Sequence, residues 1–309
     1  MANASITSNY AGQAALPYVA PAILAADTIA NNYVSVLDNV RYKANLRKFD
    51  GAAIAAATCE FTTPGSGQMT LSDVVLTTTA LQVNEQVCNK DLRTAWEAEQ
   101  MRGQSSNSPA DFQSYAAQYV AARVAESVEY NLWQGNYDSD GSSGGTASHT
   151  LFNGICKLIV DAAPTYETEL TAAIDSTTII GNLTSLVNTS PDALKGDPEA
   201  KIYMSRKTAH LYYQALAGTY QIQFLNDGLV SRFMGYNIIT PAGMPNDTLV
   251  LSRPENLYFG TDLLTDHIEA AVLNLMGVTG DDVTRVIMKF SGGTAIVDHD
   301  SYSVVRRVS

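Results

Sequence analysis

Charged side chains are scarce in this sequence. They make up 16% of its residues, against about a quarter in a typical soluble protein. The charge is also unbalanced, because 31 acidic residues face only 19 lysines and arginines, for a net charge of −12. Broad binding to nucleic-acid phosphates needs clustered basic residues, so the composition argues against it. Low charge in a soluble chain indicates either an extensive polar, uncharged contact surface or many loops rich in serine, threonine and asparagine.

Cysteines and long apolar runs are also few. The three cysteines, Cys59, Cys88 and Cys156, form an odd and sparse set, which argues against a disulfide framework and indicates a reducing compartment. We read all three as buried or free thiols. No stretch of about 20 apolar residues exists, so we expect no membrane span. Residues 1–20 lack a basic start and a long apolar run, so we expect no secretory signal.

Motifs for catalysis are missing as well. The sequence has no P-loop, no Gly-x-Ser-x-Gly elbow and no His-Glu-x-x-His zinc motif. Residues 136–141 imitate the start of a calcium loop, but Ala147 stands where the closing glutamate belongs. Asp298, His299 and Asp300 would alternate along a strand and could not converge on one ion, which favours a turn or a subunit contact. We therefore expect no catalytic residue, no metal ligand and no cofactor.

What the sequence does contain is a long stretch that can form strands but no core of its own. Residues 49–90 alternate apolar and threonine-rich positions around a Pro64-Gly65-Ser66-Gly67 tip, which predicts one long β-hairpin whose paired residue numbers sum to about 131. An isolated two-stranded hairpin is marginally stable at best in water. The helix that follows cannot cover both of its faces. We hypothesise that a neighbouring subunit covers the hairpin, which would make this an assembly protein.

The remaining pattern mixes helices and strands and predicts an α+β protein. Ser108-Pro109-Ala110-Asp111 is a strong helix start, and no glycine or proline follows until Gly135. The resulting helix of about 26 residues would be roughly 39 Å long. Residues 200–205 predict a strand and residues 206–216 a helix. Two terminal strands are expected at residues 283–290 and 302–308, with a turn at Ser291-Gly292-Gly293 and a short strand at 294–297.

This order of elements resembles the major capsid proteins of tailed double-stranded-DNA phages, which have the Hong Kong 97-type fold. The likeness covers nearly the whole chain. Its local motifs are each weak but follow one another in the family's order: Glu129–Asn136, Phe152–Ile155, Tyr203–Thr208, Gly235–Ile238 with Met244-Pro245, Leu257–Asp262 and the terminal strands up to Val304.

The resemblance implies a division of the chain into the parts of that fold. These are an N-terminal arm (1–48), an extended hairpin loop (49–90), a peripheral domain with a long spine helix (91–150), an axial domain (151–250) and strands that return to the peripheral and axial domains (251–309). It also implies assembly contacts at the hairpin tip and at the tip of the axial domain, through Phe61, Pro64, Gly65, Gly67, Tyr220, Phe224 and Asp227.

The function implied is that of a structural, non-enzymatic subunit. Hexamers and pentamers would form an icosahedral shell around double-stranded DNA, without sequence-specific binding. Assembly would take place in the cytoplasm of a bacterial host, the product would be a virion, and portal, scaffolding or cement proteins could be partners. Covalent cross-linking through a lysine of the loop is not expected, because no lysine lies between Lys48 and Lys90. Two alternatives remain open, an encapsulin-like compartment with enzyme cargo and, more remotely, an α/β enzyme.

Overall fold

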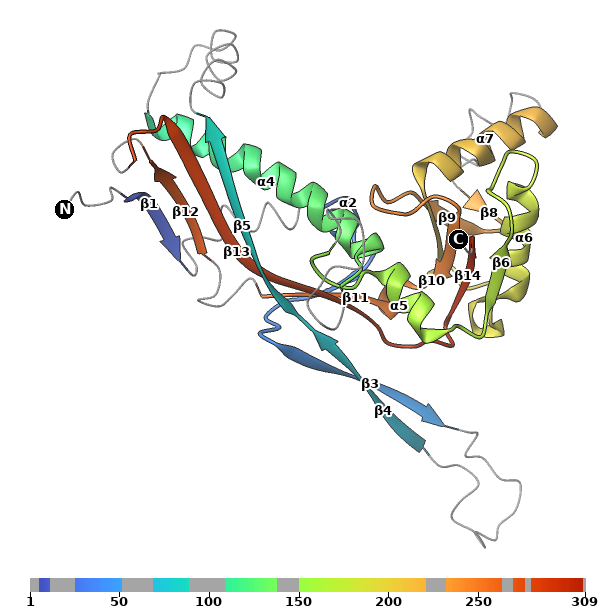
Figure 1. Cartoon of the computed structure of the whole chain (residues 1–309). Coiled ribbons are helices and arrows are strands. Elements are labelled where there is room, and N and C mark those ends of the chain that lie inside the picture. The colour runs from blue at the N-terminus through green and yellow to red at the C-terminus, as the bar shows by residue number, and fades with distance from the viewer. Residues whose placement is uncertain are drawn as a thin grey trace, which may run out of the picture.

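The computed structural model describes residues 6–11, 26–51, 69–88, 109–137, 150–220, 232–262, 269–275 and 279–307. Helices and sheets are mixed, as the sequence predicts. Figure 1 shows two regions side by side, one built on the long helix α4 and the other carrying α6 and α7, with a two-stranded ribbon projecting from between them. Within the described residues, no helix is long and apolar enough to cross a bilayer.

The first region contains a six-stranded sheet whose longest strand is β13. β13 pairs with β12 on one edge and with β5 on the other, and its last residues pair with β11. β1 extends the sheet beyond β12, and β2 extends it beyond β11. The strands are β1 (Ile6–Ala11), β2 (Ser35–Leu37), β5 (Thr79–Cys88), β11 (Leu257–Thr261), β12 (Glu269–Asn274) and β13 (Val283–Ile296).

Helix α4 (Pro109–Gln134) confirms the predicted long helix at both ends. Its buried side chains include Val124, Val128 and Leu132, and they share a core with Val286 and Met288, which point to the same face of β13. Helix α5 (Ile155–Ala162) completes this core. The alternating burial along the first half of β13 follows from the period of two in a strand, since one face meets the helix.

The second region is a six-stranded sheet covered on both faces. Its order is β6 (Glu167–Leu170), β14 (Tyr302–Arg307), β10 (Thr248–Ser252), β7 (Lys201–Met204), β9 (Tyr236–Ile239) and β8 (Arg232–Phe233). Alternate residues of its central strands face the core under α4 and a second core under α6 (Ile179–Thr189) and α7 (Arg206–Tyr220). Continuous apolar runs such as Leu249-Val250-Leu251 are typical of strands that are buried on both sides. A short 3₁₀ helix, η2 (Asp192–Leu194), completes the region, and a second one, η5 (Pro254–Asn256), contacts β2 and β11 of the first region.

A buried polar joint ties the start of the chain to α4. Helix α2 (Asp27–Ala30) lies shortly before β2 in the chain. The Thr28 amide and hydroxyl donate to the two carboxylate oxygens of Glu129, at 2.9 and 2.6 Å, and Trp133 Nε1 donates to the Thr28 hydroxyl at 2.8 Å. The Gly243 amide lies 3.4 Å from Glu129 Oε1. Because all these groups are buried, their bonds fix α2, α4 and the loop before β10 to one another.

The predicted hairpin register is wrong. β3 (Lys43–Gly51) pairs with β4 (Met69–Thr77), from Lys43 opposite Thr77 to Gly51 opposite Met69, so paired numbers sum to 120 and not 131. The predicted second strand is divided, because residues 79–88 form β5 and pair with β13. Leu81 is buried beneath α4, and this packing draws β5 into the sheet. The predicted arm also contributes β1, β2 and most of β3.

The predicted turn at Ser291-Gly292-Gly293 is also wrong, because β13 runs straight through it. Gly293 pairs with Gly260 of β11, and the base of the projecting ribbon crosses this pair of glycines. A Cβ on Gly293 would lie 2.2 Å from the Thr77 carbonyl oxygen, and one on Gly260 would lie 2.4 Å from a Leu76 methyl carbon. These glycines permit a close approach rather than a chain reversal. The chain turns later, between β13 and β14.

Candidate functional site

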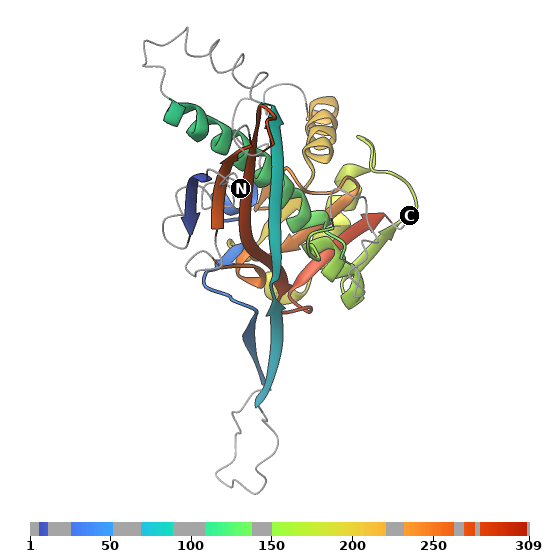
Figure 2. The same cartoon turned by 60° about the vertical axis from the view of Figure 1, so that its left-hand side comes forward.

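The ribbon of β3 and β4 is the most conspicuous surface of the described chain. Figures 1 and 2 show it extending away from both regions, with β4 nearly in line with β5. A single residue, Thr78, separates β4 from β5, and its amide donates to the Tyr42 carbonyl oxygen at 3.0 Å. The ribbon is therefore a two-stranded sheet of its own that follows directly on strand β5 of the first sheet.

The two faces of the ribbon differ in what they contact. Ala44, Leu46, Val74 and Leu76 alternate onto the inner face, where they form a small core with Val40, Ala295, Leu37 and Tyr258. The outer face carries the intervening residues of both strands. Because strand side chains alternate between faces, one side of the ribbon is anchored to its own chain, and no described residue covers the other.

The outer face carries exposed apolar side chains, whereas an exposed strand face of a monomeric protein is expected to be polar. Phe49 is 68% exposed and lies directly opposite Leu71, which is 52% exposed, and Val75 is 48% exposed. Tyr42, just before β3, is 66% exposed. Single exposed apolar residues are common on proteins, but a group of them on one face of a projecting ribbon indicates an interaction surface.

Two ion pairs flank these apolar residues and differ in kind. Arg47 and Asp73 face each other across the outer face at 3.7 Å, and both side chains are largely exposed. Lys48 points the other way, and its Nζ lies 2.6 Å from Asp298 Oδ1, in the turn between β13 and β14. Both members of this second pair are mostly buried, at 25% and 21% exposure. The first pair lies within the ribbon, whereas the second joins the ribbon to the body.

The environment of Asp298 favours its charged form. Burial alone would raise the pKa of this carboxyl. Hydrogen bonds from Lys48, the Ser301 hydroxyl and the Asp300 amide, together with the positive charge of Lys48, outweigh burial and lower the pKa below its ordinary value. The Asp298-His299-Asp300 segment is thus a turn, as the sequence favoured. Among the described residues, no group of histidines, cysteines and acids could hold a metal.

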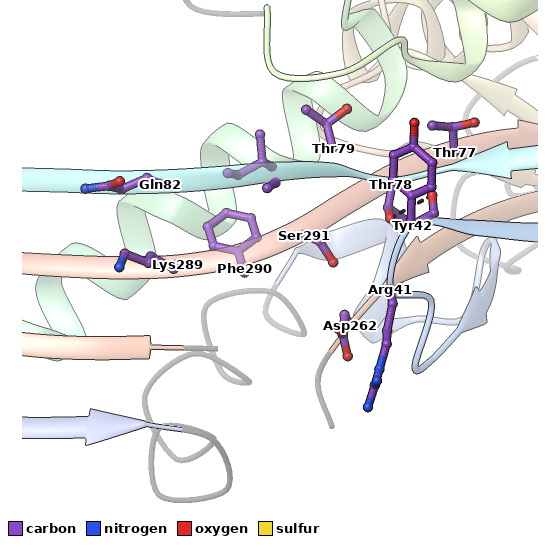
Figure 3. Close-up of a pocket in the computed structure, with 12 residues that line it drawn as sticks. Arg41, Tyr42, Thr77, Thr78, Thr79, Gln82, Asp262, Lys289, Phe290 and Ser291 are labelled. Carbon is purple, nitrogen blue, oxygen red and sulfur yellow. Dashed lines mark hydrogen bonds between the residues drawn. The ribbon is translucent and has the colours of Figure 1, made fainter. Parts of the chain in front are cut away.

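A cavity of about 610 Å³ lies where the ribbon joins the first sheet. Figure 3 shows Tyr42 and Thr78 at one end of it and Gln82 and Lys289 along the two neighbouring strands. The remaining lining residues are Arg41, Thr77, Thr79, Ala80, Leu81, Asp262, Phe290 and Ser291. The described residues therefore leave this side of the ribbon's base open.

The predicted contact residues mostly lie outside the described part of the chain. This holds for Phe61, Pro64, Gly65, Gly67, Phe224 and Asp227, while Tyr220 is the last residue of α7. Sequence reasoning missed the outer-face residues. The alternation of Ala44 and Leu46 with polar neighbours would have indicated an additional strand before residue 49.

The two described cysteines carry no disulfide. Cys88 is exposed, and Cys156 packs against the core under α4. Burial raises the pKa of the Cys156 thiol to about 12. A thiol with so high a pKa is not a nucleophile at neutral pH.

Comparison with known proteins gives a result at the level of fold. No protein-family profile and no curated protein sequence matches the chain. Among solved structures, it is similar to a chain of the satellite phage P4 procapsid, determined with its size determination (Sid) protein, at 12% identity over 95% of this chain and 90% of that one, with a TM-score of 0.64. A capsid chain of an empty GTA particle matches at 13% identity over 94% and 90% of the chains, with a TM-score of 0.55. A chain of Gordonia phage Cozz matches at 13% over 91% and 87%, with a TM-score of 0.53. This chain therefore has the fold of phage capsid proteins.

Proposed function

We propose that this protein is the major capsid protein of a tailed phage, with the Hong Kong 97-type fold, and that hexamers and pentamers of it form an icosahedral shell around double-stranded DNA. One observation carries the proposal beyond fold similarity. The projecting ribbon has an apolar outer face, with Phe49, Leu71 and Val75 exposed, that the described part of the chain leaves open. A second copy of the chain is the partner that this surface fits, because every subunit of a shell both offers a ribbon and receives one.

The parts of the chain take the roles that this fold gives them. The first sheet with α4 corresponds to the peripheral domain and its spine helix, and the second sheet with α6 and α7 corresponds to the axial domain. The projecting ribbon corresponds to the extended hairpin loop. Residues 218–228, including Tyr220, Phe224 and Asp227, would lie at the tip of the axial domain near a five- or sixfold axis. Residues 52–68, including Phe61 and Pro64, would extend the ribbon across the neighbour.

The charge of the chain supports a container rather than a DNA-binding protein. A net charge of −12 repels phosphates, so the wall would enclose DNA without gripping it tightly. Such a subunit needs no catalytic site, and the high pKa of the Cys156 thiol fits this. Portal, scaffolding and cement proteins are the further partners that a phage head would require, and assembly would occur in the bacterial cytoplasm. An encapsulin-like compartment and an enzyme are the less favoured alternatives.

The register of the ribbon allows a precise test. Leu46 and Val74 are paired across β3 and β4, so residues 47–73 can be replaced by a two-residue Asn-Gly turn without changing the base of the ribbon. The unaltered protein should form closed shells of uniform size in the electron microscope. The shortened protein, which also lacks Lys48, should fold and unfold cooperatively within about 4 °C of the unaltered protein, and yet form no closed shells.

The outcomes separate the candidate functions. Normal shells from the shortened protein would overturn the proposed role of the ribbon. An unaltered protein that stays a small monodisperse species would overturn the proposal that the protein forms a shell. Particles purified from their native source should contain DNA. Particles that contain a protein cargo instead would favour the encapsulin-like alternative.

A further inference from the structure

Lys48 differs from its neighbours on the ribbon. The Arg47 side chain is 64% exposed and Phe49 is 68% exposed, whereas the Lys48 side chain is only 25% exposed. Lys48 reaches the body of the protein at Asp298, across 250 positions of sequence. It lies five residues beyond Lys43, the first paired residue of the ribbon, or about 17 Å along the strand. The contact thus holds the ribbon at a point well beyond its base.

Asp298, which accepts the hydrogen bond from Lys48, is held in place by other hydrogen bonds. Asn256 of η5 binds Asp298 twice, because its side-chain amide donates to the Asp298 carbonyl oxygen at 2.8 Å and its side-chain oxygen accepts from the Asp298 amide at 2.7 Å. The Asp300 amide donates to Asp298 Oδ1 at 3.0 Å, and the Ser301 hydroxyl donates to Oδ2. A carboxylate held at both backbone and side chain can orient a flexible lysine at little entropic cost, because only the lysine must be ordered.

We propose that Lys48 and Asp298 are positioning residues for assembly, and that their contact sets the angle between the ribbon and the body. The inference rests on the proposed function, in which the ribbon lies on a second copy of the chain. The described part of the ribbon is about 26 Å long at 3.3 Å per residue, so a 10° change at its base moves Gly51 by about 4–5 Å. A displacement of that size would shift the outer-face apolar residues out of contact with the neighbour. The pair therefore sets the curvature with which copies join.

The angle can be measured on the free subunit, which separates this inference from assembly. Spin labels at Leu71→Cys on β4 and Val160→Cys on α5 report the distance from the ribbon to the body. Both positions are exposed, and the three native cysteines are replaced by serine. We expect a narrow distance distribution for the parent protein, a distribution at least twice as wide for Lys48→Met, and recovery of the narrow one for Lys48→Arg. Arg47→Met is the matched control, because it breaks an ion pair within the ribbon and should leave the distribution unchanged.

The same variants are then assembled and their particles measured by electron microscopy. Lys48→Met should give a broader range of particle diameters, while the subunit still unfolds cooperatively and within about 4 °C of the parent. Asp298→Asn tests the contact from the other side and should widen the distance distribution in the same way. Equal distance distributions for the parent and Lys48→Met would overturn the inference even if shells form normally. A widened distribution in a protein that never forms shells would uphold the contact and overturn the proposed function.

Discussion

Replacing Phe49 and Leu71 by threonine should separate assembly from folding. Threonine keeps the strand preference, and the two side chains are 68% and 52% exposed in the free subunit. Full burial of such a side chain is worth about 1.5–3 kcal/mol, so burying the exposed portions against a neighbour contributes about 2–3 kcal/mol for the pair. Losing it should raise the subunit concentration needed for assembly by roughly 30- to 150-fold. The free energy of unfolding of the free subunit should change by less than about 1 kcal/mol, because these surfaces are already in water.

The assay compares two curves for each variant. Light scattering against subunit concentration gives the onset of assembly, and urea unfolding followed by circular dichroism gives the stability of the subunit. Leu76→Ala is the control on the inner face. Leu76 is fully buried, so this change should destabilise the subunit by about 2–5 kcal/mol. The reasoning is refuted if the double threonine variant assembles at the parent's concentration, or if it destabilises the free subunit as strongly as Leu76→Ala does.

Three further changes test other parts of the structure. Gly293→Ala would place a methyl carbon 2.2 Å from a carbonyl oxygen of β4, and urea unfolding should show that the free energy of unfolding falls by about 2 kcal/mol or more. The control is Gly181→Ala in α6, which has open space around it and should leave the stability equal or higher. Equal effects of the two changes would contradict the close approach at Gly293. Trp133→Phe removes the buried hydrogen bond to the threonine hydroxyl of α2 and should cost about 1–3 kcal/mol; an unchanged unfolding curve would refute this. Because the pKa of Asp298 is lowered, its contact with Lys48 stabilises the fold above the carboxyl's ordinary pKa of 3.8, and this stabilisation is lost as pH falls through the lower folded-state pKa. The difference in stability between the parent and Asp298→Asn should therefore be present at neutral pH and shrink in acid. A difference that does not change with pH would show that the charge is not responsible.

Local signals in the sequence located the long helix but not the packing around it. The signals at Ser108 to Asp111 and at Gly135 predicted the ends of α4, because capping and glycine termination act within a few residues. The same local reasoning failed at Gly292-Gly293, since a glycine that forms a turn and a glycine that lets another strand approach look alike in sequence. Only the tertiary contact of β4 with β13 distinguishes them.

The candidate site was predictable in kind but not in its residues. The composition of the hairpin and the marginal stability of isolated hairpins predicted a surface that requires cover, and cover by a neighbouring subunit stays a prediction. The hairpin's register depends on the packing of Leu76 against Gly260 of β11 and of Thr77 against Gly293 of β13, residues about 180 to 220 positions away. Since a change of register changes which residues share a face, the outer face of Phe49 and Leu71 could not be identified until that packing was known.

The near-collinear arrangement of β4 and β5 has a mechanical consequence. A pull on the ribbon away from the body is transmitted through Thr78 into β5, along its axis. β5 is paired with β13 over ten residues, from Thr79 opposite Gly292 to Cys88 opposite Val283. Such a pull loads the whole ladder in shear, so its hydrogen bonds share the force instead of opening one after another. In the shell proposed above, tension between neighbouring copies would thus be spread over this ladder where the ribbon enters the sheet.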